Sequence, residues 1–211
     1  MKTNALLVFF FLVALFASTR ADYVRDSEGH IVHSGGIYYL VPQDFAGAAI
    51  VATSIENPDG CSLAVVEKLL NNKGNAVIIE AMARTAYITT SSSFHLSFHP
   101  LPSNNCTKHP QWIIVMDEDF GQNAVMVGAR GEFEFPVTGL FYFKTYNSAK
   151  HQYNLVFCSN QYTCGPVAIK TDGYENRRLI IAEQAASVKP LVLKLVKTSG
   201  DRVASHVSMV V

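Results

Sequence analysis

The sequence predicts an all-β fold, a β-trefoil of twelve short strands with pseudo-threefold symmetry, and three observations support this. Helical periodicity is nearly absent from the 211 residues. Short β-branched and aromatic runs instead alternate with clusters of Gly, Pro, Asn and Asp. The runs recur in sets of four, with first strands centred near Tyr39, Leu96 and Leu155, at spacings of 57 and 59 residues. A sandwich or a jelly roll, which also use many short strands, is the alternative architecture.

Each predicted strand is a short run rich in apolar residues, bounded by turn residues. The first set is IYYLV at 37–41, AIVAT at 49–53, LAVVE at 63–67 and AVIIE at 76–80. The second set is FHLSF at 94–98, IIVMD at 113–117, AVMVG at 124–128 and LFYFKT at 140–145. The third set is YNLVF at 153–157, VAIK at 167–170, RLIIA at 178–182 and LVLKL at 191–195. The third strands, centred near Val65, Met126 and Ile180, lie 61 and 54 residues apart, which supports three similar units.

Residues 1–21 are expected to be a secretory signal peptide. Lys2 is followed by thirteen unbroken apolar residues from Ala5 to Ala17, and a small-residue cleavage site ends at Ala21. Thirteen residues fall short of the roughly 20 that span a bilayer, so a transmembrane helix is disfavoured. Cleavage leaves one domain, residues 22–197, and a tail, residues 198–211, whose apolar end is read as a frayed terminus or a sorting signal.

The charge balance and the motif content exclude several classes of function. Without Lys2 and Arg20 of the leader, 15 of the 17 basic residues remain against 17 acidic ones, a net charge of −2. No basic patch points to nucleic acid or to an anionic membrane. The seven histidines are scattered, and neither G-x-S-x-G nor H-E-x-x-H occurs. We therefore expect a monomer without enzymatic activity, metal or cofactor.

Four cysteines in a secreted chain predict two disulfides, for which the sequence permits three pairings. Cys158 and Cys164 lie in one short turn, where a local bridge forms easily, and this leaves Cys61 with Cys106. Asn105 opens the N-x-S/T sequon of the mature chain and is a candidate glycosylation site. The half-cystine in the middle of this sequon could hinder the transferase.

A many-position pattern follows the leader. It comprises Val24, Asp26, Glu28-Gly29-His30 and Val32, then after five residues Tyr38 and Leu40. This closely resembles the N-terminal signature of the plant Kunitz inhibitors of the soybean trypsin inhibitor type. Later segments extend the resemblance over about residues 22–197, namely YNLVFC at 153–158, CGPVAI at 164–169, RRLII at 177–181 and KPLVL at 189–193. It implies a secreted β-trefoil, extracellular or vacuolar, with the disulfide pairing given above, from a family in which many members block serine proteases.

The resemblance also implies where the protease-binding loop lies. In the family this loop joins the fourth and fifth strands and carries a basic residue at the scissile position, P1. Counting from Ile79 to Ile88 places Arg84 there, and the reactive bond is then Arg84–Thr85. A trypsin-like protease holds a carboxylate at the base of its S1 pocket, which a guanidinium reaches. Small neighbours let the backbone run extended against the protease, and the expected loop is Ala81, Met82, Ala83, Arg84, Thr85, Ala86 and Tyr87.

Two departures from the family pattern predict a softer loop. The family commonly places an Asn before the Gly-Gly of the signature, where this chain has Ser34, and the soybean-type loop has Pro at P3, where this chain has Met82. The expected partner is a trypsin-like serine endopeptidase. The alternatives are a family member without inhibitory activity, with a storage, defence or taste-modifying role, or an inhibitor of another hydrolase through a different face.

Overall fold

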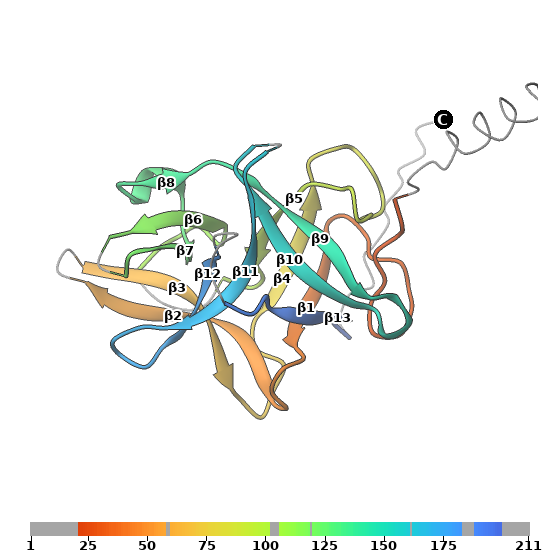
Figure 1. The fold of residues 1–211 in the computed structure, drawn as a ribbon, viewed down its shortest axis with the longest axis horizontal. Coiled ribbons are helices and arrows are strands. Elements are labelled where there is room, and N and C mark those ends of the chain that lie inside the picture. The colour runs from red at the N-terminus through yellow and green to blue at the C-terminus, as the bar shows by residue number, and fades with distance from the viewer. Residues whose placement is uncertain are drawn as a thin grey trace, which may run out of the picture.

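The computed structural model describes residues 21–57, 60–101, 106–118, 120–160, 162–182 and 188–199 (Figure 1). The leader up to residue 20, the candidate glycosylation site Asn105 and the tail from residue 200 lie outside the described residues. No helix among the described residues is long and apolar enough to cross a membrane. The strands are β1 (Gly36–Pro42), β2 (Ala48–Asn57), β3 (Gly60–Leu69), β4 (Ala76–Ala81), β5 (Phe94–Phe98), β6 (Trp112–Asp117), β7 (Gln122–Val127), β8 (Pro136–Val137), β9 (Leu140–Asn147), β10 (Gln152–Cys158), β11 (Cys164–Thr171), β12 (Arg177–Ile181) and β13 (Val192–Lys197).

Six strands close into a barrel. Their order is β13-β1-β4-β5-β9-β10, and the pairing of β10 with β13 completes the ring. The other long strands form three hairpins, β2–β3, β6–β7 and β11–β12, whose inner strands β3, β7 and β12 pair with one another. A closed barrel capped by three hairpins is a β-trefoil, so the predicted fold and all twelve predicted strands are confirmed. The thirteenth strand, β8, was not predicted, because two residues carry no periodicity.

The predicted symmetry-related positions are wrong by one residue in the first unit. Burial alternates along β1, β5 and β10, and Leu40, Leu96 and Leu155 all point inward. Tyr39 is only half-buried and points out of the barrel, so Leu40 is the equivalent of the other two leucines. The positions predicted for the third strands show the same one-residue error. Val65 packs into the barrel core, whereas Met126 packs on the other side of its hairpin. Large aromatic residues fill the barrel interior next to these leucines, including Tyr38, Phe94 and Tyr153.

The cap contains a buried charge pair. Arg178 on β12 is 4% exposed, and its Nη2 donates to the Oδ2 of Asp117 on β6 at 2.6 Å. Its guanidinium carbon lies 4.7 Å from the centre of the Phe120 ring, and Nη2 also contacts the sulfur of Met126 at 3.3 Å. The aliphatic and aromatic neighbours exclude water, so Asp117 is the counter-charge of this guanidinium.

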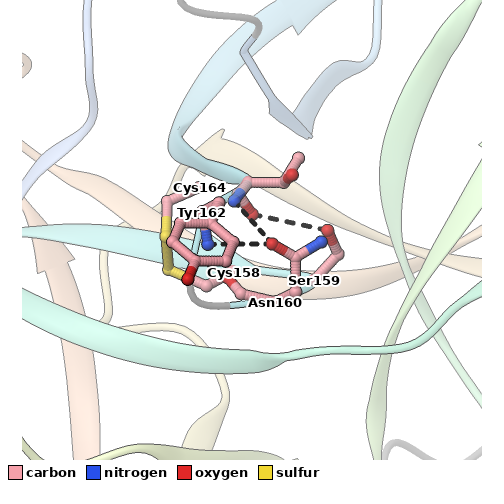
Figure 2. The surroundings of a disulfide bond; sticks show 6 residues. Cys158, Ser159, Asn160, Tyr162 and Cys164 are labelled. Atoms are coloured by element: carbon pink, nitrogen blue, oxygen red, sulfur yellow. Dashed lines mark hydrogen bonds between the residues drawn. A yellow bond between two sulfur atoms is a disulfide. The ribbon is translucent and has the colours of Figure 1, made fainter.

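Both disulfides have the predicted pairing, Cys61–Cys106 and Cys158–Cys164. The second bridge closes the turn between β10 and β11 (Figure 2). Inside this turn the Asn160 side chain accepts hydrogen bonds from the backbone N–H groups of Tyr162 and Thr163, at 2.8 and 2.9 Å. Asn160 therefore orders the turn independently of the sulfur–sulfur bond.

Replacing Cys61 and Cys106 together with alanine should lower the free energy of unfolding by about 4 kcal/mol, because the bridge closes a long loop in the unfolded chain. The cysteines of this bridge are 45 residues apart, whereas Cys158 and Cys164 are 6 apart. The matched replacement of Cys158 and Cys164 should cost only about 2 kcal/mol. Urea unfolding monitored by the single tryptophan measures both, and a larger loss for the short bridge would contradict the prediction.

Candidate functional site

The connection from β4 to β5 leaves the barrel at the end away from the cap. β4 follows the cap hairpin β2–β3 and runs to the opposite end of the barrel, where the olive loop in Figure 1 begins. From Met82 to Tyr87 every residue is exposed, Arg84 included. Within the described part of the chain, the Arg84 side chain has no hydrogen bond or ion pair. Its guanidinium is therefore available to a partner.

Ser34 connects the two flanks of this loop. Its Oγ accepts a hydrogen bond from the Ala81 N–H at 3.0 Å, and its own N–H donates to the Ala86 carbonyl at 3.0 Å. The next residue, Gly35, donates to the Ile79 carbonyl at 2.7 Å. Ser34, the residue expected to support the loop, is thus hydrogen-bonded to the chain on both sides of Arg84.

The segment after Arg84 is anchored further by the N-terminal segment. His33 and Tyr87 form an antiparallel bridge, and their rings lie 4.9 Å apart. Tyr23 packs edge-on against Tyr87 with ring centres 5.9 Å apart. Ile88 is fully buried, and its N–H donates to the Val32 carbonyl at 2.9 Å. These supports were not predicted, because they depend on which strands meet in the fold and not on any local pattern.

The apex of the loop turns, which corrects the expectation of an extended backbone. The Thr85 N–H donates to the Ala83 carbonyl at 2.7 Å, a three-residue γ-turn centred on Arg84. Among the described non-glycine residues only His151 and Glu175 have positive φ, so this is the common inverse form. Arg84, at the centre of this turn, is exposed. The turn also leaves the apex with few other bonds.

A hollow of about 510 Å³ lies beside the loop, lined by Ala83, Thr85 and Ala86 on one side and by Thr89 and Ser91 on the other. The Met82 N–H reaches across to the Ser93 carbonyl at 2.9 Å. Residues 83–85 receive no hydrogen bond from Ser34. The base of the loop is therefore held by hydrogen bonds to other segments, whereas its apex is held by its own turn.

Fold and loop together define a class of protein, a β-trefoil that presents one exposed arginine on a loop tied at both flanks. Residues 24–191 match the family described as Kunitz-type "Trypsin and protease inhibitor", and the chain belongs to this family. Among curated relatives, "Trypsin inhibitor DE-3" of Erythrina caffra is 29% identical over 161 residues, covering 75% of this chain and 90% of that protein.

Solved structures agree with this assignment. Trypsin inhibitor 1 from Senna obtusifolia is 33% identical, with a TM-score of 0.73, covering 92% of this chain and all of the other. The soybean trypsin inhibitor, in its complex with porcine pancreatic trypsin, is 29% identical with a TM-score of 0.71, covering 83% of this chain and 99% of the inhibitor.

Replacing Ser34 with alanine should weaken protease binding about tenfold, because the Ala81 N–H loses its acceptor and the loop loses one flank support. The Ser34 N–H bond to Ala86 is a backbone bond and should persist. Inhibition constants for trypsin measure the effect, and Ser92→Ala, whose hydroxyl bonds within the 89–92 turn, is the matched control. An unchanged constant for Ser34→Ala would mean that the remaining contacts suffice to hold the loop.

Proposed function

We propose that this chain inhibits trypsin-like serine proteases by presenting Arg84–Thr85 as a substrate-like bond. The single observation that carries the proposal is the exposed Arg84, unpaired among the described residues, at the apex of a loop whose flanks both bond to Ser34. Membership of a family of trypsin and protease inhibitors supports it. A guanidinium entering the S1 pocket of such a protease meets a carboxylate and pairs with good geometry.

Inhibition differs from hydrolysis in that the loop must stay in place when the bond is attacked. Before Arg84, Ala81 is held by Ser34 and Met82 by the Ser93 carbonyl. After it, Ala86 is held by Ser34 and Tyr87 by its bridge to His33. If Arg84–Thr85 is cut, both new chain ends remain attached to the barrel, so the Thr85 amine stays beside the acyl-enzyme and the bond can reseal. Because these attachments exist before docking, little conformational entropy is lost on binding.

The same proposal includes the organisation of the chain. Residues 1–21 act as a cleaved leader, residues 22–197 form the inhibitory domain and residues 198–211 are a tail. Both disulfides fit an oxidising compartment, and we place the mature protein outside the cytosol, in the extracellular space or the vacuole.

Titration of trypsin and of chymotrypsin with the mature protein tests the function. Trypsin activity should fall linearly to a one-to-one end point. Chymotrypsin should be inhibited at least about a hundredfold less tightly, because its apolar S1 slot leaves the guanidinium without a counter-charge. Full trypsin activity at a large excess of correctly folded protein would contradict the proposal and favour a family member without inhibitory activity.

A further inference from the structure

We infer that Met82 is an oxidation site through which peroxide weakens the inhibitory loop, an inference that rests on the proposed function. Met82 lies two residues before Arg84 and is 54% exposed. Its backbone is fixed by the bond from its N–H to Ser93 and by the neighbouring bond from Ala81 to Ser34. More than half of Met82 is thus exposed to solvent, on a backbone held by hydrogen bonds from its own N–H and from that of Ala81.

The other described methionines provide an internal comparison. Met116 on β6 is 41% exposed, a value similar to that of Met82, but it belongs to the cap. Met126 on β7 is 5% exposed, and its sulfur already lies 3.3 Å from the Arg178 guanidinium. No cysteine is free, so no thiol competes for the oxidant. Exposure therefore selects Met82 and Met116, and only Met82 lies on the inhibitory loop.

The reaction is a two-electron oxygen transfer from a hydroperoxide. A lone pair of the Met82 sulfur attacks the terminal peroxide oxygen, the S–O bond forms, the O–O bond breaks, and the remaining oxygen leaves as water or an alcohol after taking up a proton. The product is methionine sulfoxide. A methionine sulfoxide reductase reverses the change with a dithiol, which becomes a disulfide while the oxygen leaves as water.

The sulfoxide changes how the loop meets a protease. With Arg84 in the S1 pocket, Met82 is only two residues before it in the chain, so its side chain can reach the rim of the protease cleft. An apolar side chain gains from being covered there, whereas a sulfoxide oxygen loses its hydration. Affinity for trypsin should therefore fall about tenfold while the fold is unaffected.

The test treats the protein with hydrogen peroxide, removes the excess with catalase, maps the sulfoxides by mass spectrometry and then measures trypsin inhibition. Met82 and Met116 should oxidise well before Met126, and affinity should fall about tenfold in step with Met82 sulfoxide. Whatever its own inhibition constant, Met82→Leu should show the same constant before and after treatment, whereas Met116→Leu should lose affinity on treatment. Methionine sulfoxide reductase should restore the loss.

A footprint provides a second measurement. Bound trypsin should protect Met82 but not Met116 from oxidation, and trypsin with a blocked active site should protect neither. Oxidation of Met82 no faster than that of Met126, or unchanged affinity after complete Met82 oxidation, would overturn the inference. If the untreated protein does not inhibit trypsin, the proposed function fails, while the order of oxidation and its effect on the rate of tryptic cleavage after Arg84 still decide the inference.

Discussion

Replacing Arg84 with alanine is expected to weaken trypsin binding by about 4–8 kcal/mol, the upper range for a residue at the centre of an interface. The reason is that the alanine methyl leaves the S1 carboxylate of the protease desolvated and unpaired. The fold should be unaffected, because Arg84 is exposed and the described core lies inside the barrel and under the cap. The inhibition constant for trypsin measures the loss, and urea unfolding verifies the fold.

Two further variants separate P1 recognition from general charge effects. Arg84→Lys should retain most of the affinity, because an ammonium also reaches the S1 carboxylate. Arg130→Ala removes another exposed arginine, in the 3₁₀ helix Arg130–Glu132 outside the loop, and should leave inhibition unchanged. Equal effects of Arg84→Ala and Arg130→Ala would show that the guanidinium of Arg84 has no special role.

Replacing Asp117 with alanine is expected to lower the free energy of unfolding by about 3–5 kcal/mol, because it leaves the Arg178 guanidinium buried without its counter-charge. Arg178 is 4% exposed and donates to Asp117 at 2.6 Å, so water solvates its guanidinium poorly once the carboxylate is removed. Inhibition by the folded fraction should persist, because the loop lies at the other end of the barrel. Chemical unfolding gives the magnitude.

The control for this prediction is an exposed ion pair in which an aspartate is again the acceptor. Lys189 donates to Asp44 at 2.7 Å, but the lysine side chain is 70% exposed. Asp44→Ala should cost less than about 1 kcal/mol, as exposed pairs do. Similar losses of unfolding free energy for Asp117→Ala and Asp44→Ala would mean that water enters the cap and solvates the Arg178 guanidinium.

Strand positions could be predicted from the sequence because each strand is a compact apolar run between turn residues. Which side chains of each strand point into the barrel could not be predicted to within one residue. The centre of the run IYYLV is Tyr39, yet Leu40 is the residue that points into the barrel with Leu96 and Leu155. Because side chains alternate, an error of one position moves a residue to the other face. Only pairing with the neighbouring strands decides which face is inside.

The candidate site shows the same division. The family resemblance led us to propose Arg84 as the scissile residue and Ser34 as a support, and the structure shows Arg84 exposed and Ser34 bonded to both flanks of the loop. Three further contacts of the loop could not be predicted, because they join segments separated in sequence. They are the bridge from His33 to Tyr87, the packing of Tyr23 on Tyr87, and the bond from Met82 to Ser93. The turn at Arg84 also escaped prediction, since alanine and threonine neighbours favour no particular turn.

Identifying the bond that trypsin cuts tests most directly the proposal that Arg84–Thr85 is the reactive bond. The protein is incubated with a catalytic amount of trypsin at mildly acidic pH, and the products are identified by intact mass and N-terminal sequencing. We expect a single cut, a new N-terminus at Thr85, and two fragments that remain associated after reduction of the disulfides under native conditions. Partial resealing is expected when the cut protein is returned to stoichiometric trypsin. Cleavage at another bond first, or fragments that separate and never reseal, would contradict the proposal.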